Sequence, residues 1–140
     1  MKAISKTLLS LGLVFMLGAA ITMGQGDDAL FPLVTIHSSG NVARAEIGSF
    51  VLQMTPATYP GTYINFSVSG TAVPGVDYDL LATPAYIGPS GYGTILVQTL
   101  PDPRGSFLRR QYSLVVTLES GEGYNVGEPG SAKMMIRPSL

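Results

Sequence analysis

Residues 62–69 read TYINFSVS, and this stretch decides the fold class because its apolar and polar side chains alternate. Ile64, Phe66 and Val68 fall on one face of an extended chain, while Tyr63 and the polar residues fall on the other. A helix would need apolar residues every three or four positions, and this stretch does not have that spacing. The pattern therefore predicts a β-strand with one buried face and one face in water.

The chain after residue 30 repeats this pattern in short segments that end at clusters of Gly, Pro, Ser and Asn. Further strands are predicted at 33–37, 48–54, 85–87, 92–100, 111–118 and 131–136. Seven strands in about 105 residues are typical of an all-β, seven-stranded immunoglobulin-like Greek-key sandwich. The core anchors would come from three of these strands, and they are Phe50, Leu52, Ile64, Phe66, Val68, Leu114, Val116 and Leu118.

The composition supports one small domain and excludes several classes of function. The chain has 140 residues with 17 Gly and 10 Pro, and 12% of its residues are charged. Long surface helices need more charge than this, and a hydrophobic content of 46% excludes a disordered chain. Eight basic residues against nine acidic ones give no charge pattern for nucleic acid or for an anionic membrane. We therefore expect one globular domain that binds neither.

The first 24 residues have the three-part pattern of a secretory signal peptide. Lys2 and Lys6 precede an apolar run over 8–20, and small residues follow as far as Gly24. The run falls short of the roughly 20 apolar residues that a membrane span needs. We predict cleavage after Ala20 or after Gly24, and a protein that is secreted or held in the periplasm or cell envelope without a membrane span.

Residues 69–78 read SGTAVPGVDY and form the most informative stretch for function. Two glycines and a proline constrain the loop, and Asp77 next to Tyr78 offers one carboxylate beside one large ring. Asp77 either caps this turn through local backbone amides or ligates a metal. We expect Gly75 to have a positive φ or to lie in close backbone contact, so that Gly75→Val destabilises the fold more than Asp77→Asn does.

Within this stretch, residues 70–78 read GTAVPGVDY and resemble the G-T-A-x-x-G-x-D-Y hallmark of the Calx-beta domain family. Glu46 before the second strand, the turn at 88–91 and the strand end at 100–102 are similar to other landmarks of the family. The resemblance covers residues 33–136. It implies a Calx-beta-like β-sandwich domain, which we place over 30–138, with a role in cell communication or adhesion.

Some members of the family bind calcium, and the resemblance implies a calcium site here from Glu46, Asp77 and Asp102. This chain lacks the further acids of the calcium-binding members, since Pro103 follows Asp102 and arginines precede the next strand. Ca²⁺ prefers six to eight oxygen ligands, and nearby cations repel it. We therefore predict weak or vestigial calcium binding and no other cofactor.

Two groups of side chains outside this site could recognise a partner. Arg104, Arg109 and Arg110 are expected in a solvated loop, with a small binding patch for an acidic partner as the alternative. Several tyrosines could form a face on which a sugar stacks, although tyrosine is also common on sheet surfaces. These tyrosines are Tyr59, Tyr63, Tyr86, Tyr92 and Tyr124.

The sequence offers few of the groups that enzymes use. It contains no Cys and a single His, His37, so thiol chemistry, cysteine-bound zinc and a histidine-based triad have no support. We predict a non-enzymatic secreted module that interacts with a protein or the cell surface. The alternative is a carbohydrate-binding module that uses surface tyrosines.

Overall fold

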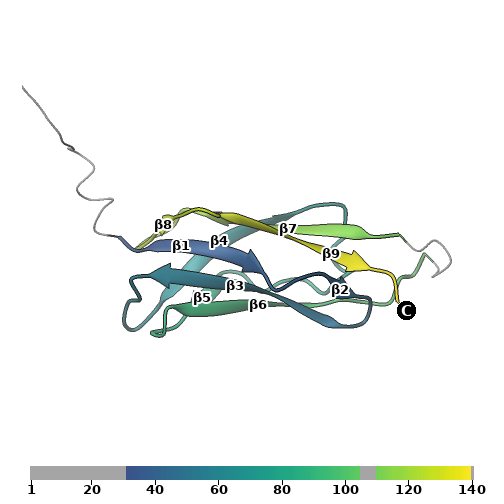
Figure 1. Ribbon diagram of the computed structural model, residues 1–140, viewed down its shortest axis with the longest axis horizontal. Helices are drawn as coiled ribbons and strands as arrows, with labels where there is room; N and C mark the ends of the chain where they lie inside the picture. The colour runs from purple at the N-terminus through teal and green to yellow at the C-terminus, as the bar shows by residue number, and fades with distance from the viewer. Residues whose placement is uncertain (1–30, 105–109, 140) are drawn as a thin grey trace, which may run out of the picture. The chain divides into compact units, whose positions relative to one another are not determined.

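The computed structural model describes residues 31–104 and 110–139, and within these ranges the chain forms nine strands and no helix. The strands belong to one compact unit over Pro32–Leu140 (Figure 1). In chain order they are β1 (Leu33–Ser38), β2 (Val42–Ala43), β3 (Ile47–Thr55), β4 (Thr62–Ser69), β5 (Ala85–Ile87), β6 (Tyr92–Gln98), β7 (Tyr112–Glu119), β8 (Asn125–Val126) and β9 (Ser131–Arg137).

The strands form two sheets, as expected for a β-sandwich. One sheet has the order β6-β3-β1-β8, and the other has the order β2-β9-β7-β4-β5. Paired strands are antiparallel except for β1 with β8 and β2 with β9, which are parallel. The chain passes from the first sheet to the second between β1 and β2, so residues 33–43 contribute one strand to each sheet (Figure 1).

The buried side chains of the two sheets meet in one hydrophobic core. In β4, Ile64 and Phe66 are buried while Tyr63 and Asn65 are exposed, which is the alternation read from the sequence. Each fully buried aliphatic or aromatic side chain contributes about 1.5–3 kcal/mol, so this alternation is a main source of stability. Seven of the eight predicted core anchors are buried. Val68 is exposed instead, because β4 leaves the core after Phe66.

All seven strands predicted from the sequence are present, with ends that agree within two residues, and the described residues form two more strands, β2 and β8. The sequence does not predict β2 and β8 because strands of two residues cannot show an alternating pattern. Each is defined by its parallel pairing with a strand that lies far away along the chain.

Two further predictions concern the start of the chain and the membrane. The signal peptide predicted over 1–24 lies outside the described residues. Over 31–104 and 110–139, the structure contains no helix with the length and apolar character that a membrane span requires.

Candidate functional site

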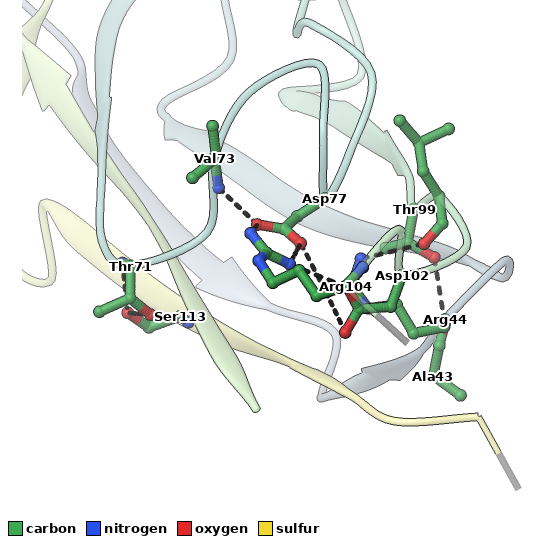
Figure 2. Close-up of polar contacts among 10 residues, drawn as sticks. Ala43, Arg44, Thr71, Val73, Asp77, Thr99, Asp102, Arg104 and Ser113 are labelled. Carbon is green, nitrogen blue, oxygen red and sulfur yellow. Dashed lines mark hydrogen bonds and ion pairs between the residues drawn. The ribbon is translucent and has the colours of Figure 1, made fainter. Parts of the chain in front are cut away.

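The loop after β4, residues 70–78, is fastened to β7 at its start. Gly70 has a φ of +111°, and a Cβ at this position would lie 2.4 Å from the carbonyl oxygen of Ser113, so only glycine fits. The N–H of Ser113 donates to Oγ1 of Thr71 at 2.8 Å, and the N–H of Thr71 donates to Oγ of Ser113 at 3.0 Å (Figure 2). These reciprocal bonds set the path by which the loop leaves the sheet.

The second half of this loop turns Asp77 and Tyr78 into the interior. Gly75 has a φ of +80°, as predicted, and its N–H donates to the carbonyl oxygen of Tyr78 at 2.7 Å. The N–H of Asp77 donates to the carbonyl oxygen of Val73, and the Asp77 carboxylate accepts the N–H of Val73 at 2.7 Å. The turn-capping interpretation of Asp77 is thus confirmed, and its side chain is fully buried.

Two arginines from distant parts of the chain converge on the Asp77 carboxylate (Figure 2). Arg104 contacts both oxygens, with Nη1 at 2.8 Å from Oδ1 and Nη2 at 3.0 Å from Oδ2. Arg44, which follows β2 directly, places Nη2 at 2.5 Å from Oδ1. Asp102 lies 3.0 Å from Nη1 of Arg104 and 3.6 Å from Nη2 of Arg44. These four residues are called the ion cluster below, and their formal charges cancel.

The ion cluster lies largely out of water. The side chains of Asp77 and Arg44 are 0% and 1% exposed, and those of Asp102 and Arg104 are 13% and 28% exposed. The guanidinium group of Arg44 also donates from Nη1 to the carbonyl oxygen of Leu100 at 3.0 Å. A buried charge is costly unless it is paired and hydrogen-bonded. Each charge here therefore depends on its partners, and removing one leaves another uncompensated.

An aromatic ring and a hydroxyl group border the ion cluster. The guanidinium carbons of Arg104 and Arg44 lie 4.3 and 5.4 Å from the centre of the Tyr112 ring, which is the range of a cation–π interaction. Thr99 follows β6 and is buried, and its Oγ1 lies 3.0 Å from the carbonyl oxygen of Ala43. The cluster thus connects the loop after β4 with the ends of β2 and β6 and the start of β7.

The ion cluster lowers the pKa of both of its acids. Burial by itself raises the pKa of Asp77, but hydrogen bonds from Arg104, the amide of Val73 and Arg44 outweigh it and bring the pKa to about 2. The pKa of Asp102 is also lowered, chiefly because the backbone N–H of Arg104 donates to it. Both acids are therefore charged at neutral pH and engaged with cations, which leaves neither suited to act as a general base.

The structure brings together two of the three predicted metal ligands. Asp77 and Asp102 share the ion cluster, but the side chain of Glu46 is exposed. It is the backbone carbonyl of Glu46 that turns toward this region, 2.5 Å from Oγ1 of Thr99. In the described part of the chain, no three side chains among His, Cys, Asp and Glu gather in a group that could hold a metal. Calcium binding stays a prediction.

Sequence reasoning misses both arginines of the ion cluster. It places Arg104 in a solvated loop, and the structure corrects this because the side chain turns inward to Asp77. Arg110 is exposed, as expected, and Arg109 lies outside the described residues. The signal that could have pointed to a buried cation is the lack of further carboxylates beside Asp102, since buried charges of opposite sign must pair.

The tyrosines predicted to form one sugar-stacking face are spread over different parts of the fold. Tyr124 is buried in the core, where its hydroxyl accepts the backbone N–H of Asn65 at 3.0 Å, so it cannot be a surface ring. Tyr63 on β4 and Tyr86 on β5 are exposed, and their ring centres lie 5.1 Å apart. Tyr92 lies on β6, in the other sheet.

Comparisons with known proteins support the fold. No family model matches the chain, and no curated protein matches it. Among solved structures, the chain is similar to a two-domain protein of unknown function from Bacteroides fragilis NCTC 9343, with 14% sequence identity and a TM-score of 0.53. The match covers 83% of this chain and 48% of that one, so this chain spans about half the length of its structural neighbour. Similarity at this level of identity bears on the fold alone.

Proposed function

We propose that this chain is a secreted, non-enzymatic module of the Calx-beta type that binds a protein or another component of the cell surface. In this interpretation the seven predicted strands form an immunoglobulin-like Greek-key sandwich. β2 and β8 are then short additions at the edges of the two sheets. The stretch 70–78 supports the resemblance, because its glycines and Thr71 fix the loop and its last two residues are buried.

One observation carries the proposal that this module works without calcium. Arg44 and Arg104 form ion pairs with Asp77 and Asp102, the acids that the resemblance assigns to a calcium site. A calcium ion there would meet two guanidinium groups and few available oxygens. The arginines supply the positive charge that a bound metal would bring, so the loops are held together by the chain itself.

The state of the acidic and histidine side chains supports a binding role over catalysis. Asp77 and Asp102 are both engaged by arginine, whereas a general base needs a lone pair within reach of its substrate. His37 is exposed on β1, and the chain has no second histidine and no cysteine to complete a nucleophilic site. The chain is therefore better suited to present surfaces and loops than to perform a reaction.

Cross-linking to the envelope of the producing cell tests this function. The mature protein, labelled with a photo-reactive group on exposed Lys133, is incubated with envelope fractions in millimolar calcium and in chelator. We expect the same cross-linked partner in both conditions, at levels above those of an unrelated exported protein. Recovery of the partner in calcium alone would contradict metal independence, and recovery no better than the control would contradict a binding module.

A second candidate function is carbohydrate binding, and one specific arrangement favours it. The exposed rings of Tyr63 and Tyr86 contact each other at 5.1 Å with a tilt of 50°. Tyr63 also lines an open hollow of about 520 Å³. Exposed aromatic rings beside polar groups suit an amphipathic ligand such as a sugar. A glycan array separates the two candidates, since a protein-binding module enriches no saccharide.

A further inference from the structure

An open hollow of about 520 Å³ lies beside the start of β4. Its volume falls within the range of small-molecule sites, roughly 300–1,000 Å³. The loop 70–78 leaves the other end of β4, so the hollow and the ion cluster are separate features. Two segments line the hollow, the start of β4 and the turn between β7 and β8, and the lining residues are Gly61, Thr62, Tyr63, Asn65, Glu122 and Gly123.

Tyr63 lines this hollow and carries an exposed aromatic ring that packs against a neighbour. The side chain is 64% exposed, and its ring packs against Tyr86. The hydroxyl of Tyr86 donates to the carbonyl oxygen of Pro60 at 2.8 Å, which fixes the ring that supports Tyr63. Gly61 permits this packing, because a Cβ there would lie 2.5 Å from the Tyr86 hydroxyl. A ring ordered before binding loses little entropy when a ligand stacks on it.

Asn65 and Glu122 add polar groups to the same hollow. Asn65 lies two residues after Tyr63 on the same face of β4. Its Nδ2 donates to the carbonyl oxygen of Ser120 at 3.2 Å, which orients the amide group. The carboxylate of Glu122 is exposed and makes no ion pair with any residue in the described ranges. An amide and a carboxylate are the groups that bind sugar hydroxyls by hydrogen bonds.

The buried Tyr124 joins the two walls of the hollow. Its hydroxyl accepts the backbone N–H of Asn65 at 3.0 Å and donates to the carbonyl oxygen of Glu119. The packing around it is tight, because a Cβ on Gly121 would lie 2.8 Å from the Tyr124 hydroxyl. The turn that carries Glu122 is therefore anchored to β4 before any ligand arrives.

We propose that this hollow binds a neutral saccharide, with the C–H face of one sugar ring on Tyr63 and its hydroxyl groups on Asn65 and Glu122. The proposal rests on the carbohydrate-binding candidate above and gives that candidate a site. Glu119 pairs with Asn65 across β4 and β7, and Glu122 lines the hollow, so these two exposed acids repel saccharides that carry carboxylate groups. A quaternary ammonium group is the competing ligand, but such sites enclose the cation with several rings. Among the described residues, Tyr63 is the aromatic side chain that lines the hollow.

A glycan array followed by calorimetric titration of the enriched saccharide tests this site in the mature protein. We expect enrichment of neutral glycans, and affinity about tenfold lower or worse for Tyr63→Ala, because truncating a central aromatic contact removes much of the binding energy. Tyr63→Phe keeps the ring and should retain most of the affinity. Tyr92→Ala is the matched control, because Tyr92 is 55% exposed but lies on the other sheet. Thermal melts confirm that each variant is folded.

The results distinguish this site from the candidate function on which it rests. If a neutral glycan binds and Tyr63→Ala has the affinity of the unaltered protein, the site is wrong and the carbohydrate-binding candidate stands. If the array enriches no glycan, both are wrong, while the cross-linking result is unaffected. Enrichment of acidic glycans, or tighter binding of a choline probe than of any sugar, would overturn the proposed ligand class.

Discussion

The guanidinium group of Arg104 spans both carboxylate oxygens of Asp77, at 2.8 and 3.0 Å, although 27 residues separate them in the chain. This two-point contact is the geometry in which an arginine and a carboxylate bind most strongly. Arg44 precedes Asp77 by 33 residues in the chain and contacts the same carboxylate. The loop after β4 and the segment after β6 are thus fastened to one buried charge.

We expect Asp77→Asn to lower the free energy of unfolding more than Gly75→Val does. The asparagine leaves Arg44 and Arg104 without their shared counter-charge, and breaking a buried pair costs about 3–5 kcal/mol. Gly75→Val costs about 1–3 kcal/mol for its φ of +80°, and a Cβ there would meet no atom within 4 Å. This order reverses the expectation from the sequence, which shows neither the burial of Asp77 nor its arginines.

Urea unfolding midpoints of the two variants decide this order. The control is Asp79→Asn, because Asp79 is exposed and should change the stability by less than about 0.5 kcal/mol. A midpoint for Asp77→Asn at or above that of Gly75→Val would show that the ion cluster does little to hold the loop.

The two arginines on either side of residues 105–109 should differ sharply in their effect on stability. Arg104→Gln removes the two-point contact with Asp77 and the contact with Asp102, so we expect a clearly lower urea midpoint. Arg110 is exposed, and Arg110→Gln should leave the midpoint unchanged. Equal midpoints for the two variants would mean that Arg104 is as well solvated as the sequence suggests.

The low pKa of Asp77 predicts a loss of stability in acid. Folding lowers this pKa from an ordinary value of 3.8 to about 2, so the charged carboxylate stabilises the fold above about pH 4. This contribution, about 2 kcal/mol, is lost as the pH falls through the folded value near 2. Asp102 contributes in the same direction. The unfolding free energy of Asp77→Asn should fall less steeply over this range, and parallel curves for the two proteins would contradict the assignment.

The buried hydroxyl of Tyr124 should contribute more to the stability of the fold than the exposed hydroxyl of Tyr92. Tyr124→Phe leaves the N–H of Asn65 without its acceptor, and such a loss costs about 1–3 kcal/mol. Tyr92→Phe removes a hydroxyl that accepts a hydrogen bond from the Gln53 side chain at the surface and should cost less than about 0.5 kcal/mol. Denaturant midpoints compare the two, and an unchanged midpoint for Tyr124→Phe would show that this bond does not hold the β7–β8 turn.

Most of the fold can be predicted from the sequence because burial alternates along each long strand. In β7, Leu114, Val116 and Leu118 are all buried, as their spacing indicates. β2 and β8 cannot be predicted in this way, because pairing with distant strands defines them and two residues carry no period. Tyr124 is misplaced for a related reason, since its burial depends on the distant backbone of β4.

The candidate site is predicted only in part. Asp77 and Asp102 do lie together, since both carboxylates contact the guanidinium group of Arg104. The sequence does not predict that Arg44 and Arg104 pair with Asp77, because the residue type alone does not show whether an arginine side chain is buried or in water. The missing carboxylates beside Asp102 were the available signal, since acids without a metal need cations from the chain.

The melting temperature of the protein in chelator and in about 1 mM calcium tests most directly whether arginines take the place of calcium. A site with a Kd near 1 mM would add only about 0.4 kcal/mol at this concentration. We predict a shift below about three degrees for the unaltered protein. A shift of about ten degrees or more, abolished by Asp102→Asn, would instead show a calcium-dependent module and contradict the proposed role of Arg44 and Arg104.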